Sequence, residues 1–174
     1  MIIDKYKKIE KNLFPENFFY RHSKLVAPDL IGCYLIKKNT DKVQIKGLIV
    51  ETEAYSQEEE ACHGYRNITQ SNKSLFGEPG TFYIYKSYGI HHCLNIVTDR
   101  KDFASGVLIR AVFIPEKNER LAAGPGLVTK AFGIDTSFNA LQASNNNSLW
   151  ISKRESILEQ KDFTQTTRIG ISKA

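Results

Sequence analysis

The chain has 174 residues, of which 41% are hydrophobic and 25% charged, as is typical of one soluble globular domain with a sizeable core. No uninterrupted apolar run approaches the length of a membrane span, and the N-terminus becomes charged too early for a signal peptide. We therefore expect no membrane partner and a cytoplasmic location, at the nucleoid if the source is bacterial. The net charge of +5 permits a polyanionic partner without requiring one.

The first part of the chain predicts a short helix followed by a β-hairpin. Ser23 is the predicted N-cap of a helix over residues 25–31, and Gly32 is predicted to end it. Residues 33–36 and 43–55 have the apolar, β-branched character of strands, with a turn between them. The polar, turn-rich stretch 56–76 is predicted to be a long loop of the kind that is usually functional or mobile.

The rest of the chain predicts a succession of further strands. They cover residues 81–85, 90–98 and 106–114, and late strands are predicted at 149–152 and 167–171. A short helix is predicted over 127–132, opened by Gly-Pro-Gly at 124–126. Because the strands follow one another without crossover helices, the sequence predicts an α+β single domain with a curved, mostly antiparallel sheet flanked by short helices.

Two segments carry the candidate chemistry. In Glu51-Thr-Glu-Ala-Tyr55, strand alternation puts both glutamates and the tyrosine on one face. In the run Thr-Phe-Tyr-Ile-Tyr-Lys-Ser-Tyr-Gly at 81–89, Tyr83 and Tyr85 share a face in the same way. Carboxylates beside aromatic rings suit a flat cationic or π-rich ligand such as a nucleobase. From spacing alone, the commoner explanation of alternating glutamates is the solvent-facing side of an edge strand.

The cysteines and histidines predict no metal site. Cys33, Cys62 and Cys93 are odd in number without framework spacing, which indicates reduced thiols. His91 and Cys93 could join the adjacent Cys62-His63 pair around zinc, but neither pair has the spacing of structural zinc ligands. The zinc deaminase signature is absent, and so are the Walker, Rossmann and nucleophile-elbow motifs. We expect no cofactor.

Taken together, these segments resemble the alkyladenine (3-methyladenine) DNA glycosylase family. The matching segments run in family order along nearly the whole chain, at residues 21–32, 49–55, 61–63, 79–89, 93–96, 106–111, 123–125 and 168–170. The resemblance implies a single α+β domain with a curved antiparallel sheet. It also implies a monofunctional DNA glycosylase of base excision repair, which flips alkylated or deaminated purines out of duplex DNA. The expected substrates are of the 3-methyladenine, 7-methylguanine and hypoxanthine class.

The resemblance implies roles for three residues in catalysis. Glu53 corresponds to the catalytic base that activates a water molecule. Arg110 and the backbone carbonyl of Ile169 correspond to the groups that hold this water. No lysine nucleophile is needed for this chemistry, so we expect no strand cleavage.

Five further residues are implied to contact DNA. Tyr55, His63 and Tyr85 correspond to the aromatic residues that stack on the flipped base, and Asn95 to the residue at the floor of the pocket that screens purine substituents. Tyr88 corresponds to the residue inserted into the duplex where the base was. The expected partner is double-stranded DNA with damaged purines, bound by a monomer.

Two alternatives and one departure accompany this interpretation. A catalytically silent nucleic-acid-binding module would gain nothing from Glu53, and a hydrolase of free nucleosides would not need Tyr88. The chain stops at Ala174, whereas members of the family generally continue through another apolar strand. We therefore expect a single glycosylase domain over residues 1–174 that is either a short member of the family or truncated at its C-terminus.

Overall fold

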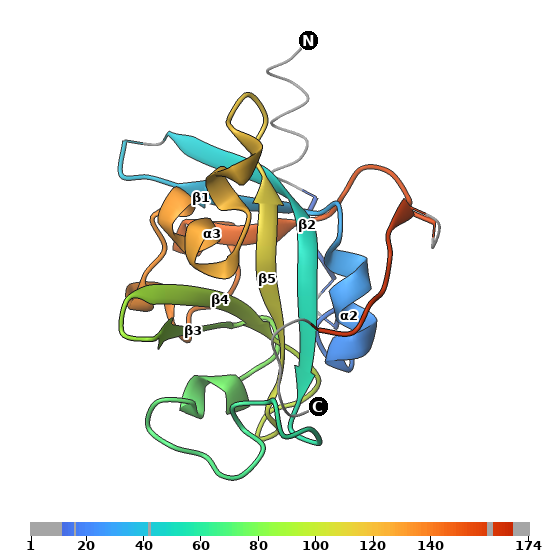
Figure 1. Cartoon of the computed structure of the whole chain (residues 1–174), viewed down its shortest axis with the longest axis vertical. Helices are drawn as coiled ribbons and strands as arrows, with labels where there is room; N and C mark the ends of the chain where they lie inside the picture. The colour runs from blue at the N-terminus through green and yellow to red at the C-terminus, as the bar shows by residue number, and fades with distance from the viewer. Residues whose placement is uncertain (1–11, 16, 42, 160–161, 169–174) are drawn as a thin grey trace.

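The computed structural model describes residues 12–15, 17–41, 43–159 and 162–168, and in them a curled, six-stranded antiparallel sheet (Figure 1). The strand order is β3-β4-β5-β2-β1-β6. The strands are β1 (Tyr34–Lys38), β2 (Gln44–Ser56), β3 (Phe82–Ser87), β4 (His91–Val97), β5 (Ser105–Phe113) and β6 (Leu149–Ser152), and the helices are α2 (Ser23–Leu30) and α3 (Pro125–Phe132). The predicted α+β fold with a curved antiparallel sheet is confirmed.

One face of the sheet carries the main core. Helix α2 packs against β2 and β5, and helix α3 packs against β4 and β5. Leu30 from α2 and Phe132 from α3 are both buried there, among the inward side chains of the strands. None of the described helices is long and apolar enough to cross a membrane.

Strand β3 divides its side chains between two clusters, as alternation predicts. Phe82 and Ile84 are buried in the main core. Tyr83 lies in a second, smaller cluster with Tyr85 packed against it, and this cluster includes Leu75 from the long loop after β2. The two tyrosines therefore lie on the face of the sheet that the loop covers.

Strand β2 changes the direction of its alternation part-way along. Ile49 is buried in the main core and Ala54 packs against that core, although strict alternation would put two residues five positions apart on opposite faces. The register with β5 shifts between Ile49 and Glu51, where Val50 is an extra, exposed residue. This β-bulge turns Glu51 and Glu53 away from the main core.

Strand β5 carries a matching irregularity. Ile109 and Val112 are both buried in the main core although they stand three positions apart. The register shifts again between Glu51 and Thr52 of β2, and Arg110 falls between the two pairs. Arg110 therefore lies on the same face as the β2 carboxylates.

Two of the predicted elements are wrong in detail. Helix α2 begins at Ser23 rather than being capped by it, and its N-cap is His22, whose Nδ1 accepts a hydrogen bond from the backbone N–H of Lys24 at 3.1 Å. Gly32 follows the helix with φ +76°, a left-handed conformation that favours glycine, as predicted. Thr167 and Arg168 are not in a strand, and the remainder of the predicted strand 167–171 lies outside the described residues.

Candidate active site

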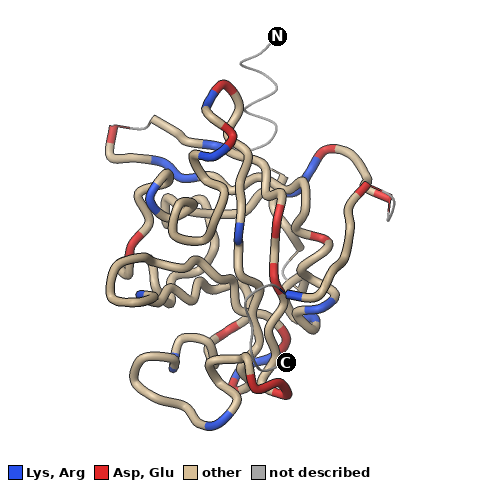
Figure 2. The backbone as a smooth tube through the Cα atoms, in the orientation of Figure 1, with Lys and Arg blue, Asp and Glu red and all other residues tan. Residues whose placement is uncertain are grey.

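Glu53 stands at the centre of a hydrogen-bond network on the face opposite the main core. Its side chain is only 9% exposed. Arg110 Nη1 donates to Glu53 Oε1 at 3.0 Å, and the Tyr55 hydroxyl donates to Glu53 Oε2 at 2.7 Å. Arg110 Nε donates to Glu51 Oε1 at 3.0 Å, so the arginine bridges the two glutamates of the motif. Figure 2 shows these acidic positions on β2 beside a basic position on β5.

This arrangement pairs the buried carboxylate of Glu53 and still leaves it able to accept a further hydrogen bond. A buried carboxylate is costly unless it is paired and hydrogen-bonded, and Arg110 provides both for Glu53. Each Glu53 oxygen receives one hydrogen bond within the network, whereas a carboxylate has about four acceptor sites. Glu53 can therefore still accept a hydrogen bond from a bound water molecule.

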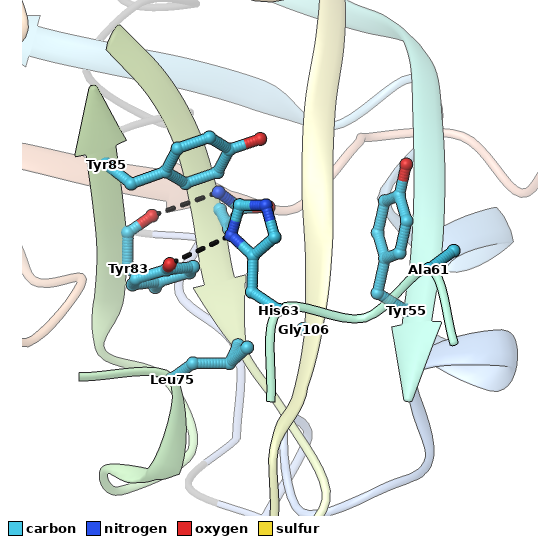
Figure 3. Close-up of a pocket in the computed structure, with 8 residues that line it drawn as sticks. Tyr55, Ala61, His63, Leu75, Tyr83, Tyr85 and Gly106 are labelled. Carbon is cyan, nitrogen blue, oxygen red and sulfur yellow. Dashed lines mark hydrogen bonds between the residues drawn. The ribbon is translucent and has the colours of Figure 1, made fainter. Parts of the chain in front are cut away.

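Tyr55 also lines a small cavity that has aromatic side chains on opposite sides, whereas Glu53 and Arg110 are not among the residues that line it (Figure 3). Tyr55 stands on one side and His63 with Tyr85 on the other. The His63 ring meets Tyr85 edge-on, with 4.4 Å between ring centroids, and its Nδ1 is hydrogen-bonded to the Tyr83 hydroxyl at 3.0 Å. The lining residues are Tyr55, Ala61, His63, Leu75, Tyr83, Tyr85, Asn95 and Gly106.

The loop after β2 is organised so that His63 reaches this cavity. The Asn72 side chain donates to the backbone carbonyls of His63, at 2.8 Å, and of Asn67, at 3.0 Å. The Asn72 amide oxygen accepts from the backbone N–H of Thr69. One buried amide therefore ties three points of the loop together and fixes the backbone beneath His63.

Asn95 supplies a polar group to the lining of the cavity. It is buried, and its amide nitrogen donates to the carbonyls of Tyr83, at 3.1 Å, and Cys93, at 3.4 Å. Among the described residues, no group donates to its amide oxygen. This oxygen is therefore the atom of Asn95 that can meet the edge of a ligand.

The walls of the cavity are electrically neutral at physiological pH. Burial, aided by the hydrogen bond to Glu53, raises the pKa of Tyr55, and burial likewise raises the pKa values of Tyr83 and Tyr85. Burial lowers the pKa of His63, which favours the neutral imidazole. A cationic aromatic ligand would therefore meet electron-rich ring faces and no like charge.

Tyr88 does not line the cavity. It lies in the turn of the β3–β4 hairpin, with φ +49°, next to Gly89 with φ +69°. Its side chain is 94% exposed, and that of Ile90 in the same turn is 72% exposed. The hairpin therefore holds two apolar side chains out into solvent.

The structure brings together most of the residues predicted for the site. Glu53, Arg110 and Tyr55 are joined directly by hydrogen bonds, and His63, Tyr85 and Asn95 share the cavity with Tyr55. Ile169 lies outside the described residues, so the role of its carbonyl stays a prediction.

The suggested zinc ligands serve other purposes. His63 is bonded to Tyr83, His91 packs against the backbone of Gly126, and Cys62 and Cys93 are buried thiols. Burial raises the pKa of both cysteines. No group of three or more His, Cys, Asp or Glu side chains in the described part of the chain could hold a metal ion. All three cysteines are free, as predicted.

Two contributors to the site were missed in the sequence. Arg168 lies over the Tyr55 ring, with its guanidinium carbon 4.6 Å from the ring centroid. Glu59, in the loop after β2, forms an ion pair with Arg168. The only sequence signal for Arg168 is its place in an Arg-Ile-Gly segment, and Glu59 is one of three consecutive glutamates.

Fold and site together define a class: a small α+β protein with a carboxylate–arginine pair joined through a tyrosine to an aromatic cavity for a flat ligand. Residues 17–174 match the model of one family, Methylpurine-DNA glycosylase. The chain therefore belongs to the methylpurine-DNA glycosylase family and is a DNA-binding repair enzyme that hydrolyses N-glycosyl bonds.

Curated relatives agree with this assignment over most of their length. A protein of Synechococcus sp. (strain JA-3-3Ab) is 43% identical over 164 residues, covering 86% of this chain and 84% of the relative. A protein of Trichodesmium erythraeum is 41% identical over 170 residues, covering 88% of this chain and 85% of the relative. A protein of Carboxydothermus hydrogenoformans is 40% identical over 172 residues, covering 92% of this chain and 89% of the relative. All three are assigned by name to 3-methyladenine DNA glycosylases.

Proposed function

We propose that this enzyme removes alkylated purines such as 3-methyladenine and 7-methylguanine, and the deaminated base hypoxanthine, from double-stranded DNA by a Glu53-activated water. The observation that carries the proposal is the position of Glu53. The Glu53 carboxylate is buried, and one of its oxygens accepts a hydrogen bond from Arg110. Its other oxygen accepts a hydrogen bond from the hydroxyl of Tyr55, which lines the cavity. A base stacked on Tyr55 would bring its glycosidic bond close to this carboxylate.

The chemistry needs few protein groups because alkylation has already activated the substrate. A purine methylated at N3 or N7 carries positive charge, and its C1′–N9 bond breaks with the electron pair going to the base, which leaves neutral. The water oxygen forms the new bond to C1′, and Glu53 takes the water proton. The carboxylate also opposes the positive charge that develops on the sugar, as carboxylates do in glycoside hydrolysis. Arg110 and the Ile169 carbonyl would hold the water.

Substrate selection would follow from the neutral aromatic walls. Each tyrosine face attracts a desolvated cation by about 0.5–2 kcal/mol, which favours alkylated purines over normal ones. The flipped base would stack between Tyr55 on one side and His63 with Tyr85 on the other, with Asn95 against its edge. Hypoxanthine is neutral, so it gains less from this effect and must take up a proton from solvent as its C1′–N9 bond breaks. It should therefore be the slower substrate.

The duplex would be engaged by the exposed hairpin and a neighbouring groove. Flipping a nucleotide costs a few kcal/mol, and Tyr88 inserted into the gap would offset part of it. A groove of about 900 Å³ shares His63, Tyr83 and Tyr85 with the base cavity. Arg66 and Lys86 line it together with one acidic residue, Glu60, and several amide and hydroxyl side chains. The two cations outnumber the carboxylate, and such a composition suits a sugar–phosphate backbone.

A catalytically silent DNA-binding module fits the site less well. A binder gains nothing from a carboxylate near a phosphate groove, since it repels the ligand and costs free energy to bury. A hydrolase of free nucleosides would leave the exposed Tyr88 without a role. We propose that the enzyme acts as a monomer, which size-exclusion chromatography with light scattering would check. We also propose that it acts in the cytoplasm.

The test is excision from a defined duplex. A 5′-labelled oligonucleotide duplex with one 7-methylguanine or one hypoxanthine is incubated with excess protein, and half of each sample is treated with alkali. We expect a cut at the damaged position only after alkali, because the enzyme leaves an intact abasic strand. An unmodified duplex is the control. Absence of cutting at both bases would overturn the proposal, and cutting without alkali would contradict the monofunctional mechanism.

A further inference from the structure

Arg168 contacts the Tyr55 ring, the backbone carbonyl of Ala54 and the carboxylate of Glu59. Its Nη1 donates to the backbone carbonyl of Ala54 and to Glu59 Oε1, the latter at 3.0 Å. Its Nη2 donates to Glu59 Oε2, which makes the ion pair bidentate. The side chains of Arg168 and Glu59 are only 18% and 21% exposed.

These contacts fix the cavity wall from outside. The Arg168 guanidinium covers one face of the Tyr55 ring at 4.6 Å, and Glu53 accepts a hydrogen bond from the Tyr55 hydroxyl. The backbone next to the ring is also held, because Ala54 immediately precedes Tyr55. Only one face of the ring then remains for a stacked base, and the ring is set before the base arrives. A preorganised wall lowers the cost of ordering on binding.

The charge of Arg168 is already used by Glu59. Burial raises the pKa of Glu59, but the hydrogen bonds from Arg168 and from the backbone of Ser56 outweigh it, so the net pKa is lowered. The hydrogen bonds that Arg168 donates to Glu59 raise the pKa of Arg168. Both groups stay ionised at physiological pH, and the pair is neutral overall. Arg168 is therefore poorly placed to serve as a phosphate-binding cation.

We propose, building on the function above, that Arg168 is a positioning residue of the glycosylase: held by Glu59, it orients Tyr55 for stacking on the damaged base. It touches neither the base nor the reacting atoms and acts through Tyr55. A merely structural alternative is that Arg168 only fastens the C-terminal segment to the body of the protein.

A matched variant separates these roles. Arg154 also ties the C-terminal part of the chain to the body, with Nη1 donating to the carbonyls of Asp29 at 2.5 Å and Ile31 at 2.9 Å, away from Tyr55. Arg154→Met and Arg168→Met therefore both remove hydrogen bonds from an arginine side chain to backbone carbonyls of the body. Only Arg168→Met also removes a contact with the Tyr55 ring. Glu59→Gln is a third variant that weakens the hold on Arg168 without removing it.

The experiment is a double-mutant cycle on single-turnover excision of 7-methylguanine, with Tyr55→Leu as the second change. We expect Arg168→Met to slow excision about tenfold in the wild-type background and less than about twofold in the Tyr55→Leu background. Glu59→Gln should change the rate in the same direction, and Arg154→Met should leave it within about twofold. Affinity for a duplex with a tetrahydrofuran abasic analogue, which has no base to stack, should be unchanged in all of them.

Each contrary result has a distinct meaning. If the wild-type protein excises neither 7-methylguanine nor hypoxanthine, the proposed function falls and this inference falls with it. If the wild type is active but Arg168→Met slows excision equally in both backgrounds, or only lowers the melting temperature as Arg154→Met does, the positioning role is overturned alone. If Arg168→Met fails to fold, the same cycle with Glu59→Gln decides, and additive effects there overturn the inference.

Discussion

The side chains around Glu53 are either neutral aromatic groups or ions paired with one another. The tyrosines and His63 are held neutral by burial, and the ions nearby are paired, Glu53 and Glu51 with Arg110 and Glu59 with Arg168. A cationic base would therefore find one dominant attraction beyond the ring faces, the carboxylate of Glu53. The protonation state of His63 is the part of this balance most sensitive to pH.

The first prediction concerns the pH dependence of stability. Because the pKa of His63 is lower in the folded protein than in the unfolded chain, its contribution to stability is complete above the unfolded pKa. This contribution is lost as pH falls through the folded pKa. Urea unfolding of the wild type should therefore show a decline in the free energy of unfolding at pH values below about 6.5 that is smaller in His63→Gln. Equal declines in both proteins would show that His63 is not held neutral.

The second prediction concerns the hairpin turn. Tyr88→Ser should weaken binding to a duplex with an abasic analogue by about 1–3 kcal/mol, the usual contribution of one stacked aromatic side chain. Excision of 7-methylguanine from a single strand should change much less, because a single strand has no stack to fill. Ile90→Ser in the same turn is the matched control and should have the smaller effect on duplex binding. Equal losses on duplex and single strand would remove Tyr88 from any role in opening the duplex.

At the scale of elements, the two register shifts between β2 and β5 decide which side chains reach the site. Ile49 and Glu51 stand two positions apart, yet one is in the main core and the other faces Arg110. If β2 continued in regular alternation through Val50, without a bulge, both glutamates would lie on the core side with Ile49. The bulge therefore places the two carboxylates of β2 on the face opposite the main core.

The third prediction tests this bulge. Deleting Val50 makes Ile49 and Glu51 neighbours, which regular alternation puts on opposite faces. Both glutamates should therefore stay on the site face, and the deletion should cost less than about 3 kcal/mol, the range expected when no unpaired charge is buried. Val50→Ala keeps the chain length and should stay within about 0.5 kcal/mol of wild type, because the side chain is exposed. Chemical denaturation with circular dichroism measures both. A deletion variant that loses well over about 3 kcal/mol of stability, as expected if Glu53 were turned into the core, would contradict the role given to the bulge.

At the scale of the whole molecule, the fold was predictable because its signals are local. Alternating apolar residues and turns mark the strands, and antiparallel order follows when no crossover helix separates them. Strand alternation alone singled out Tyr55 and Tyr85. Their convergence with His63 and Asn95 was predictable only through the family resemblance, because nothing in the spacing shows that four segments meet.

What the sequence did not predict depends on contacts between distant segments. The alternation of β2 looks continuous, and only pairing with β5 shows where Val50 is extra. The ion pair of Glu59 with Arg168 joins residues 109 positions apart, so neither has a local signal. The N-cap was misplaced by one residue because His22 and Ser23 can both accept a hydrogen bond, and the chain buries Ser23.

The central claim is that Glu53 is the base of a DNA glycosylase, and single-turnover excision of 7-methylguanine by Glu53→Gln and Glu51→Gln tests it most directly. Both variants keep an acceptor toward Arg110 and remove one charge, so they form a matched pair. Glu53→Gln should slow excision at least a hundredfold, since general base catalysis contributes about 10²–10⁴, with affinity for abasic-analogue duplex largely kept. Glu51→Gln should slow excision less than about tenfold. Near-normal excision by Glu53→Gln, or equal losses in the two variants, would contradict the claim.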